Sequence, residues 1–444
     1  MAIALSVITK YLITVMCIVY GVSSVTVLSA KTKRKEKILI KRQQYCMFAF
    51  HFASYLILFL KTENIKIALI YIVQVLFFII AMWLYRYLYP NCSLALMNHM
   101  FFLLSVGFVM LSRISFDKAV KQFIIVVLAF LISLLVPALM DFFSWIPKLG
   151  YLYGLVGIVF LSLVFVIGSE KYGSVNWISI GGFALQPSEF VKILFVFFLS
   201  SMFAKAKSFG QIAVTTVLAA LHVLILVVEK DLGAALLYFV IYIVISYVAT
   251  GRIIYFAGGL TAGTVAGVLA YFLFAHVRNR VFAWQNPWQI IDGAGYQITQ
   301  SMFAIGTGGW IGSGITQGRP LDIPVVESDF IFSAISEELG LVFAILLIII
   351  CLFVFILYMN IAMAAQEPFY KLVGIGMGIC FIFQIFLNIG GVTKFIPSTG
   401  VTLPLVSYGG SSIVSSLLIM GIMQGLFMMG NREDDEEVQH GREA

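Results

Sequence analysis

Long apolar runs, separated by short polar segments, fill most of the chain. A run of about 20 apolar residues is long enough to cross the hydrocarbon core of a membrane as a helix. Only helices and closed barrels satisfy their backbone groups there, and the sequence lacks the alternating short strands of a barrel. The pattern predicts an all-α, polytopic integral membrane protein. Its thirteen candidate spans lie near residues 5–30, 45–60, 66–89, 93–112, 121–139, 150–168, 189–205, 211–228, 232–250, 253–275, 330–358, 369–391 and 408–429.

Basic residues indicate the side of the membrane that each connection faces. Segment 31–42 holds seven lysines and arginines against one glutamate, which is typical of a cytoplasmic loop. Alternating the spans from this loop predicts an amino terminus outside, a large outer loop at 276–329 and a cytoplasmic carboxyl terminus. Two features weigh against this topology. The candidate span 45–60 is short, and the basic residues within 113–121 fall on the outer side.

Composition narrows the classes of function. The chain is 61% hydrophobic and 11% charged, with a mean hydropathy of +1.03. Its net charge of +7 fits basic loops at anionic lipid headgroups, so we expect membrane lipid and no nucleic acid as a partner. The five cysteines contain no CxxC pair, the five histidines lack ligand spacing, and no Walker-type motif occurs. Disulfides, a His/Cys metal site and ATP-driven transport are therefore disfavoured.

Four polar clusters interrupt the apolar pattern, at residues 173–192, 229–233, 306–340 and 388–412. In the predicted topology all four face the outer side, and one outward-opening polar cavity is the simplest arrangement. Glycines and prolines in the last cluster predict a broken or re-entrant segment, which is tolerated only where it lines a cavity. The glycines of the third cluster are also compatible with simple tight turns.

Charged side chains stand at the predicted beginnings of two helices. Pro187 suits a first helical turn, and Glu189 and Lys192, three residues apart, share a helix face. They form either a structural ion pair or a contact for a phosphorylated lipid headgroup. Asp329 lies where a long polar segment ends and an apolar helix begins. A carboxylate at such a boundary is costly and indicates a functional site.

Short motifs of polar residues, glycines and prolines recur in and around the four clusters. They are Ser112-Arg113-Ile114, Lys121-Gln122, Trp177-Ile178, Gln186-Pro187-Ser188-Glu189, Lys192, Asp231-Leu232-Gly233, Gly295-Tyr296-Gln297, Gln300-Ser301, Ala304-Ile305-Gly306, Asp329-Phe330-Ile331-Phe332, Glu337-Glu338-Leu339-Gly340, Thr399-Gly400, Leu403-Pro404 and Ser407-Tyr408-Gly409-Gly410-Ser411. Together these residues closely resemble the RodA/FtsW/SpoVE family of shape, elongation, division and sporulation proteins, from about Phe101 to Met429. The resemblance implies a ten-span core that polymerises the lipid-linked disaccharide lipid II into glycan strands, on the outer face of the bacterial cytoplasmic membrane. It also implies a class B penicillin-binding transpeptidase as partner.

Six predicted spans precede the Gln186–Glu189 motif, where the resembled family has three. Residues 1–92 are therefore predicted to form a three-span extension, 93–430 the core, and 431–444 an acidic, disordered cytoplasmic tail. The chain departs from the family at Asn176 (often Arg), Lys230 (often Pro), Glu327-Ser328 (often a basic residue and Thr) and Lys394 (commonly apolar).

The resemblance maps the essential carboxylate of the family onto Asp329. We expect it to act as general base on the acceptor hydroxyl, either directly or through a divalent cation, Mg²⁺ or Mn²⁺. A lipid transporter or flippase, and an inactive scaffold for the transpeptidase, remain alternatives. An outer boundary suits surface chemistry, whereas a carrier places its site near the midplane. The residues expected to bind the lipid diphosphate or sugar are Glu189, Lys192, Trp177, Gln186, Asp231, Arg278, Arg280, Gln297 and Ser407.

Overall fold

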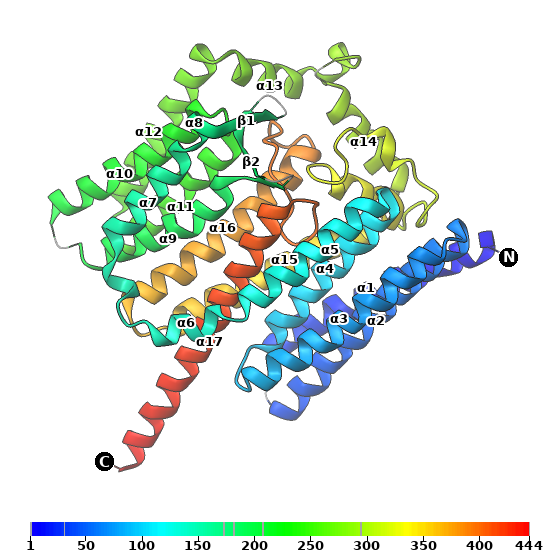
Figure 1. Cartoon of the computed structure of the whole chain (residues 1–444), viewed down its shortest axis with the longest axis horizontal. Helices are drawn as coiled ribbons and strands as arrows, with labels where there is room; N and C mark the ends of the chain where they lie inside the picture. Colours follow the sequence, from blue (N-terminus) through cyan, green and yellow to red (C-terminus); the bar gives the residue numbers. More distant parts are fainter. Residues whose placement is uncertain are drawn as a thin grey trace. The chain divides into compact units, whose positions relative to one another are not determined.

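The protein is helical along most of its length in this computed structural model (Figure 1), which describes residues 2–30, 32–171, 174–180, 183–206, 208–293 and 295–443. The elements are α1 (Ala2–Leu28), α2 (Lys33–Thr62), α3 (Ile65–Leu88), α4 (Leu94–Ile114), α5 (Phe116–Ser133), α6 (Val136–Phe142), η1 (Ile146–Lys148), α7 (Gly150–Ser162), α8 (Val164–Ile167), β1 (Gly168–Lys171), β2 (Ser174–Ile180), β3 (Phe183–Leu185), α9 (Pro187–Ala204), α10 (Phe209–Val228), α11 (Leu232–Thr250), α12 (Ile253–Leu273), α13 (Ala275–Gln285), η2 (Pro287–Ile290), α14 (Tyr296–Gly308), η3 (Pro320–Asp322), α15 (Ile331–Ala364), α16 (Pro368–Val392) and α17 (Gly410–Glu443).

Thirteen helical segments in the described part are long and apolar enough to cross a membrane, which confirms the predicted class and count of spans. The doubtful span 45–60 belongs to α2, which has 30 residues. The prediction that residues 31–42 form a loop is wrong. Thr32 caps α2 by accepting from Lys35 N (3.3 Å), and lysine and arginine are good helix formers, so the basic residues form its first turns. Lys31 lies outside the described residues.

Two further segments contain more helix than the sequence pattern predicts. The connection 276–329, predicted as a loop, contains nearly all of α13, all of α14 and two short 3₁₀ turns. Residues 276–292 hold no glycine, and α14 holds two only in its last three residues, so both segments can be helical. The acidic segment after residue 430, predicted to be disordered, continues α17 to Glu443. By contrast, residues 393–409 are non-helical, which agrees with the predicted break between the last two spans.

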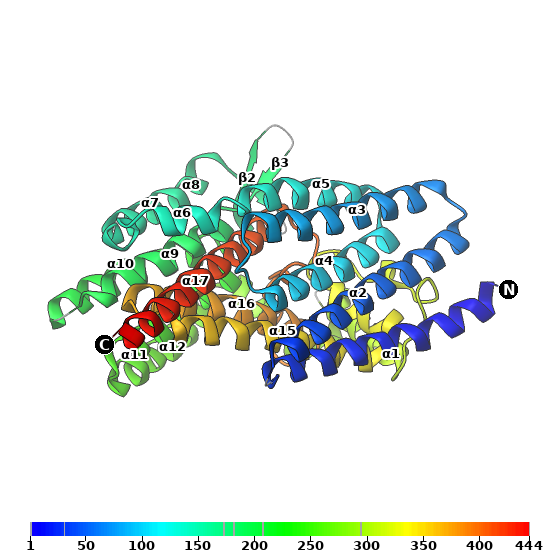
Figure 2. The same ribbon diagram turned by 90° about the horizontal axis from the view of Figure 1, so that it is seen from below.

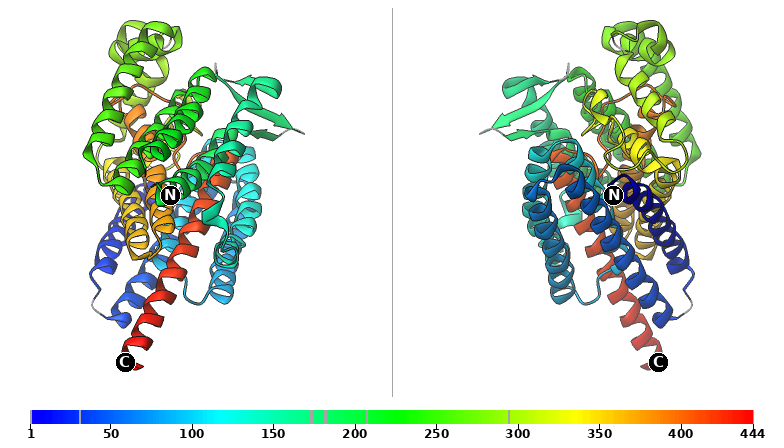
Figure 3. Two further views of the ribbon diagram at one scale, coloured as in Figure 1. Left: turned by 90° about the vertical axis from the view of Figure 1, so that its left-hand side faces the viewer. Right: turned by 90° about the vertical axis from the view of Figure 1, so that its right-hand side faces the viewer.

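A small antiparallel sheet, absent from the predictions, occupies the polar cluster before α9. The strand order is β1-β2-β3, with Ser169 opposite Trp177 and Ser179 opposite Ala184. Its strands, teal in Figure 3, adjoin α8, and β2 contacts α9. Residues 172–173 and 181–182 of this cluster lie outside the described part. The strands are too short, and too interrupted by glycine, to stand out in a sequence dominated by spans of 20 residues.

The chain divides into two compact units, each built from segments distant in sequence. The first comprises Met1–Phe130, Ala283–Ile356 and Asn388–Gly409, and the second comprises Leu131–Phe282, Leu357–Leu387 and Gly410–Ala444. In the first unit, α1 to α4 lie side by side (Figures 1 and 2), and α4 is buried almost throughout. In the second, α9 packs against α7, α10 and α11.

Polar contacts fix the position of α2 along α4 inside the first unit. On α4 the residues Asn98, Ser105 and Ser112 are seven apart, so they lie along one helix face. Asn98 Nδ2 donates to Gln43 Oε1 (2.9 Å), His51 Nδ1 contacts Ser105 Oγ (2.8 Å), and Tyr55 Oη contacts Ser112 Oγ (2.7 Å). Because a slip along the helix would leave these buried groups unpaired, the contacts fix the position of the extension on α4.

Candidate functional site

Asp329 lies two residues before α15, in the first unit, and its side chain is half-buried. Asn388, near the end of α16, holds the backbone around it: its Nδ2 donates to Asp329 O (2.9 Å) and to Val401 O (2.7 Å). A Cβ at Gly400, whose φ is +73°, would lie 3.7 Å from Asp329 Oδ2. The carboxylate therefore faces the non-helical segment 393–409, and that segment determines its surroundings.

The two residues before Asp329 are also anchored. Tyr408 N donates to Glu327 O (2.7 Å), and the Glu327 carboxylate pairs with Lys118 of α5. Ser407 Oγ donates to Ser328 O, while Leu403 N donates to Ser407 Oγ (2.9 Å). Ser407 was expected to bind substrate. Its buried hydroxyl instead joins two backbone groups, Ser328 O and Leu403 N, and so positions the residues next to Asp329.

Gln122 of α5 ties down the other end of the same segment. Its Nε2 donates to Ser407 O (3.0 Å), and its Oε1 accepts from Gly409 N (3.3 Å). The buried amide of Gln122 thus pairs one carbonyl and one N–H of the non-helical backbone. Buried backbone groups need such partners because water cannot reach them. The segment next to Asp329 is therefore rigidly held.

The glycine-rich segment 309–314 is inserted into α15 at Gly340. There φ is +88° and ψ is 169°, a conformation that only glycine adopts readily, and the helix is interrupted. A regular helix would bond Leu341 N to Glu337 O and Val342 N to Glu338 O. Instead, these two amides donate to Gly309 O (2.9 Å) and Trp310 O (3.0 Å).

The two carbonyls freed at the same kink are satisfied by the same segment. Ser313 N donates to Glu337 O (2.9 Å), and Gly314 N donates to Glu338 O (2.9 Å). Four backbone bonds thus replace two helical ones, which makes segment 309–314 a splint across α15. The glycines of this cluster were expected to line a site or to permit turns. In segment 309–314 they have a third role, because they let its backbone approach the backbone of α15 closely enough to form these bonds.

Glu337 and Glu338, two turns into α15, each accept a hydrogen bond from a segment distant in sequence. Arg113 Nε donates to Glu338 Oε1 (2.9 Å), and Arg113 Nη2 donates to Gly318 O (3.2 Å). Glu337 Oε1 accepts from Arg319 N (2.8 Å). Arg113 is one of the basic residues whose outer location weighs against the predicted topology. It neutralises the fully buried Glu338 and also holds the loop that follows the splint.

In the second unit, Glu189 and Lys192 form the predicted ion pair on α9. Lys192 is 2% exposed and also donates to Gln384 Oε1 (2.9 Å), while Glu189 Oε2 accepts from Ser415 Oγ (2.8 Å). Gln384 Nε2 in turn approaches Ser412 Oγ (3.4 Å). The pair is embedded in a polar network from three helices, so both charges are compensated within the protein.

Asp231 forms a second network in the same unit, at the beginning of α11. Its Oδ1 accepts from Ala234 N (3.1 Å), as an N-cap does. Its Oδ2 accepts from Asn176 Nδ2 (2.8 Å) on β2 and from Gln186 Nε2 (3.0 Å) before α9. Asp231 thereby joins the first two polar clusters, 173–192 and 229–233. Its contact with Gln186 agrees with the expectation that these clusters lie on the same side of the membrane.

Glu229 is a buried carboxyl that the sequence singles out only as a member of the polar cluster 229–233. It is 1% exposed, and its Oε1 has no hydrogen-bond partner among the described residues. Burial, and secondarily the neighbouring charge of Asp231, raise the pKa of Glu229 to about 8. Glu229 is therefore protonated at neutral pH. The sequence holds one signal of this shifted pKa: Glu229 and Asp231 are two acids only two residues apart at the junction of two helices.

The remaining expected residues lie on separate elements. Trp177 is half-buried on β2, and Arg278 and Arg280 lie on α13, where Arg278 is exposed and donates to Phe272 O (3.3 Å). Gln297 is exposed on α14. Arg278 and Arg280 share the second unit with Lys192 and Asp231, whereas Gln297 shares the first with Asp329.

The donor set around Asp329 restricts the kind of metal that it suits. Among the described residues there is no group of three or more His, Cys, Asp or Glu side chains that could hold an ion. Mg²⁺ is commonly bound by one or two carboxylates together with the phosphates of a substrate. A single half-buried carboxylate fits that mode and does not fit a cage made by protein alone.

Comparison with known proteins agrees with this architecture. The model of the FtsW/RodA/SpoVE family, described as cell cycle protein, matches residues 86–430. The peptidoglycan glycosyltransferase RodA of Mycobacterium tuberculosis is 37% identical over 297 residues, which are 63% of this chain and 63% of that protein. The probable peptidoglycan glycosyltransferase FtsW of Trichlorobacter lovleyi is 33% identical over 72% of this chain and 89% of its own length. The match thus spans less than two thirds of the mycobacterial relative.

Solved structures share the fold. One chain, from a study entitled "Structural coordination of polymerization and crosslinking by a peptidoglycan synthase complex", has a TM-score of 0.65 and 24% identity, covering 76% of this chain and 98% of that chain. The rod shape determining protein RodA of Thermus thermophilus has a TM-score of 0.55 and 23% identity, covering 76% of this chain and 97% of its own. Helices α1 and α2 and most of α3 precede the family match. From residue 86 to 430, this chain belongs to the FtsW/RodA/SpoVE family of cell cycle proteins.

Proposed function

We propose that this protein is a peptidoglycan glycosyltransferase that polymerises lipid II into glycan strands, with Asp329 as its general base. The observation that carries the proposal is a carboxylate at a loop–helix boundary that faces Gly400, with its own backbone carbonyl held by Asn388 of α16. The names of the mycobacterial RodA and of the Trichlorobacter FtsW, both glycosyltransferases, support the same reaction class.

The proposed reaction joins the acceptor 4-hydroxyl to the anomeric carbon of the donor sugar. The new bond forms from the hydroxyl oxygen to that carbon, and the bond from the carbon to the diphosphate-lipid oxygen breaks. Asp329 accepts the hydroxyl proton, and the polyprenyl diphosphate leaves with the bonding electron pair. A positioned general base contributes about 100- to 10,000-fold, so orientation and charge stabilisation must supply the rest. A divalent cation bound by Asp329 and the substrate would supply stabilisation of the leaving diphosphate.

Recognition of the diphosphate requires cations that can release their present partners. Lys192 is buried and already compensated by Glu189, so it could meet a phosphate only by sharing that partner. Arg278 is exposed on α13, with Arg280 two residues later. We propose the two arginines as the primary diphosphate contacts and the Glu189–Lys192 pair as the element that orients α9. Trp177, Gln186, Asp231 and Gln297 remain proposed sugar or headgroup contacts.

The partners follow from the same proposal. Lipid II is the substrate, a class B penicillin-binding transpeptidase is the protein partner, and the location is the bacterial cytoplasmic membrane. From the charge pattern we propose that the amino terminus and residues 276–329 lie outside and the acidic carboxyl end in the cytoplasm. A peptidoglycan synthase complex is the subject of the structural study that contains the similar fold.

The direct test uses purified protein in lipid nanodiscs, labelled lipid II and gel separation of the products. Polymer formation by the protein alone, or only with its transpeptidase, supports the glycosyltransferase. Empty nanodiscs and the transpeptidase alone are the controls. If the protein in sealed vesicles moves labelled lipid II across the bilayer and forms no polymer in nanodiscs, it is a flippase. If neither occurs while the transpeptidase gains activity, the protein is a scaffold.

A further inference from the structure

The extension formed by α1 to α3 lies almost wholly before the family match, yet α1 reaches the splint in α15. Lys10 Nζ, on α1, donates to Gly312 O (3.3 Å), across 302 positions of sequence. Gly312 is the residue of the splint closest to the kink, because a Cβ at Gly340 would lie 2.2 Å from Gly312 N. A cation of the extension therefore contacts the splint at the kink itself.

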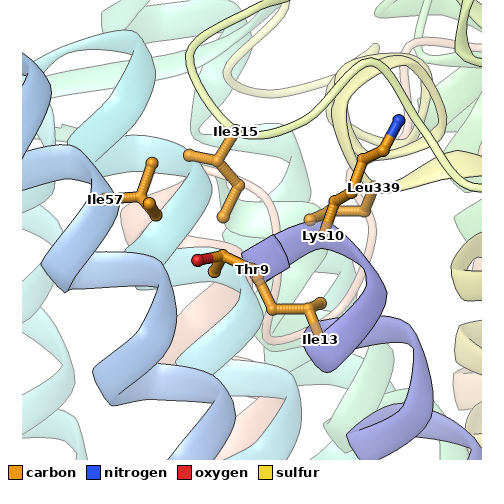
Figure 4. A pocket seen from close by; sticks show the side chains of 6 residues that line it. All are labelled: Thr9, Lys10, Ile13, Ile57, Ile315 and Leu339. Atoms are coloured by element: carbon orange, nitrogen blue, oxygen red, sulfur yellow. The ribbon is translucent and has the colours of Figure 1, made fainter. Parts of the chain in front are cut away.

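A packing junction surrounds this contact (Figure 4). Thr9, Lys10 and Ile13 of α1 and Ile57 of α2 enclose a cavity with Ile315, which follows the splint, and Leu339 of α15. Its volume is about 10 Å³, no more than a single water requires. In Figure 4 the nitrogen of Lys10 points away from this junction, toward the loop ribbon. The site is thus a closed joint between the extension and the splint, too small to hold a ligand.

The position of α1 is itself fixed by hydrogen bonds. Tyr20 Oη contacts His99 Nδ1 of α4 (3.0 Å), and Gln43 Nε2 of α2 donates to Ser24 Oγ (3.1 Å). Together with the α2–α4 contacts described above, these bonds prevent α1 from sliding along its neighbours. Lys10 is therefore presented to Gly312 by a rigid support.

A second cation holds the other end of the same loop. Arg113 of α4 donates to Gly318 O (3.2 Å) and pairs with Glu338. Lys10 and Arg113 thus hold the loop at Gly312, within the splint, and at Gly318, after it, on either side of the two amides of Ser313 and Gly314 that donate to α15. Arg113 lies in the family core, whereas Lys10 belongs to the extension, so the chain has added a contact of its own to this arrangement.

We propose that Lys10 is a positioning residue: through the Lys10–Gly312 contact, the extension holds the splint, and thereby the first turns of α15 and Asp329, in the geometry required for turnover. The statement on turnover rests on the proposed glycosyltransferase function. The mechanical part, that Lys10 stabilises the splint, stands on the contacts alone. Asp329 lies eleven residues before Gly340, so movement of this short helical segment moves the carboxylate directly.

The test compares Lys10→Met, Lys10→Arg and Lys66→Met in the full-length protein in nanodiscs. Lys66 is an exposed lysine in the first turn of α3, so its replacement removes the same charge from the same extension. Hydrogen exchange is followed at the amides of Ser313 and Gly314, and polymerisation of lipid II is measured over a range of concentrations. The exchange measurement needs no activity, so it separates failure of this inference from failure of the proposed function.

Lys10→Met is expected to speed exchange at both amides and to lower kcat, each by about 10- to 150-fold, the range for loss of one hydrogen bond to a charged group. KM should stay within about twofold, because the substrate contacts are unchanged. Lys10→Arg should retain both properties, and Lys66→Met should match the wild type. Exchange in Lys10→Met equal to that in Lys66→Met would overturn the inference. So would a Lys10→Arg variant as impaired as Lys10→Met, because the charge would then be irrelevant.

Discussion

Replacing Gly340 with alanine tests whether the splint is essential to α15. The φ of +88° and ψ of 169° strain any residue with a Cβ, at a cost of about 1–3 kcal/mol. The new Cβ would also lie 2.2 Å from Gly312 N and 2.4 Å from Ile311 C, and backbone atoms cannot rotate away as a side chain can. The splint must therefore move, which weakens four backbone hydrogen bonds worth about 0.5–1.5 kcal/mol each. Together these effects destabilise the first unit by at least about 3 kcal/mol.

The matched control is Gly306→Ala on α14. A Cβ there meets nothing within 4 Å, and the residue is helical, so alanine should be neutral or stabilise by about 0.4–1 kcal/mol. Thermal unfolding in nanodiscs, with hydrogen exchange at Leu341 and Val342, compares the two variants. Gly340→Ala should unfold at lower temperature and lose protection at both amides. An unfolding midpoint and exchange rates indistinguishable from those of Gly306→Ala would refute the splint argument.

Three further predictions concern charge and topology. Glu189→Gln and Lys192→Met should each impair folding or activity, with the double variant less impaired than the sum, and strictly additive losses would remove the coupling. Burial raises the pKa of Glu229 from 4.5 to about 8, so its contribution to stability is complete below pH 4.5 and is lost as the pH rises through about 8. The unfolding temperature of Glu229→Gln should lack this pH dependence. A variant whose unfolding temperature depends on pH as the wild type's does would show that Glu229 does not cause it. With the native cysteines replaced, a cysteine at Ser313 should react with an impermeant thiol reagent on intact cells and one at Thr32 should not. Labelling at Thr32 would mean that the first 92 residues cross the membrane two or four times instead of three.

Much of the fold follows from local patterns. The spans are predictable because each is a continuous apolar run that must become a helix in lipid. The pairing of Glu189 with Lys192 follows from their spacing, and the capping of α11 by Asp231 follows from an acid just before an apolar run. These features depend on neighbours within one or two turns, which is the range that a single sequence reveals.

Other features depend on contacts between distant segments. The run 330–358 reads as one uninterrupted helix, and only the approach of residues 309–314 explains the kink at Gly340. The commitment of Ser407 to Ser328, the contact of Lys10 with Gly312 and the exposure of Arg278 likewise arise from tertiary packing. A pattern of residue types does not encode those partners: the sequence singles out Ser407 and Arg278 but shows neither the contacts they make nor any sign of Lys10.

The central claim is that Asp329 supplies the base for glycan polymerisation. The most direct measurement is the initial rate of lipid II polymerisation by Asp329→Asn, which keeps the volume of the side chain and removes its basicity. Asp322→Asn, an exposed acid in the same connection, is the matched control, and both proteins must show wild-type unfolding temperatures. We predict that Asp329→Asn loses at least about 100-fold in rate while Asp322→Asn retains wild-type activity. Near-normal polymer yield from folded Asp329→Asn protein would contradict the assignment of Asp329 as the base.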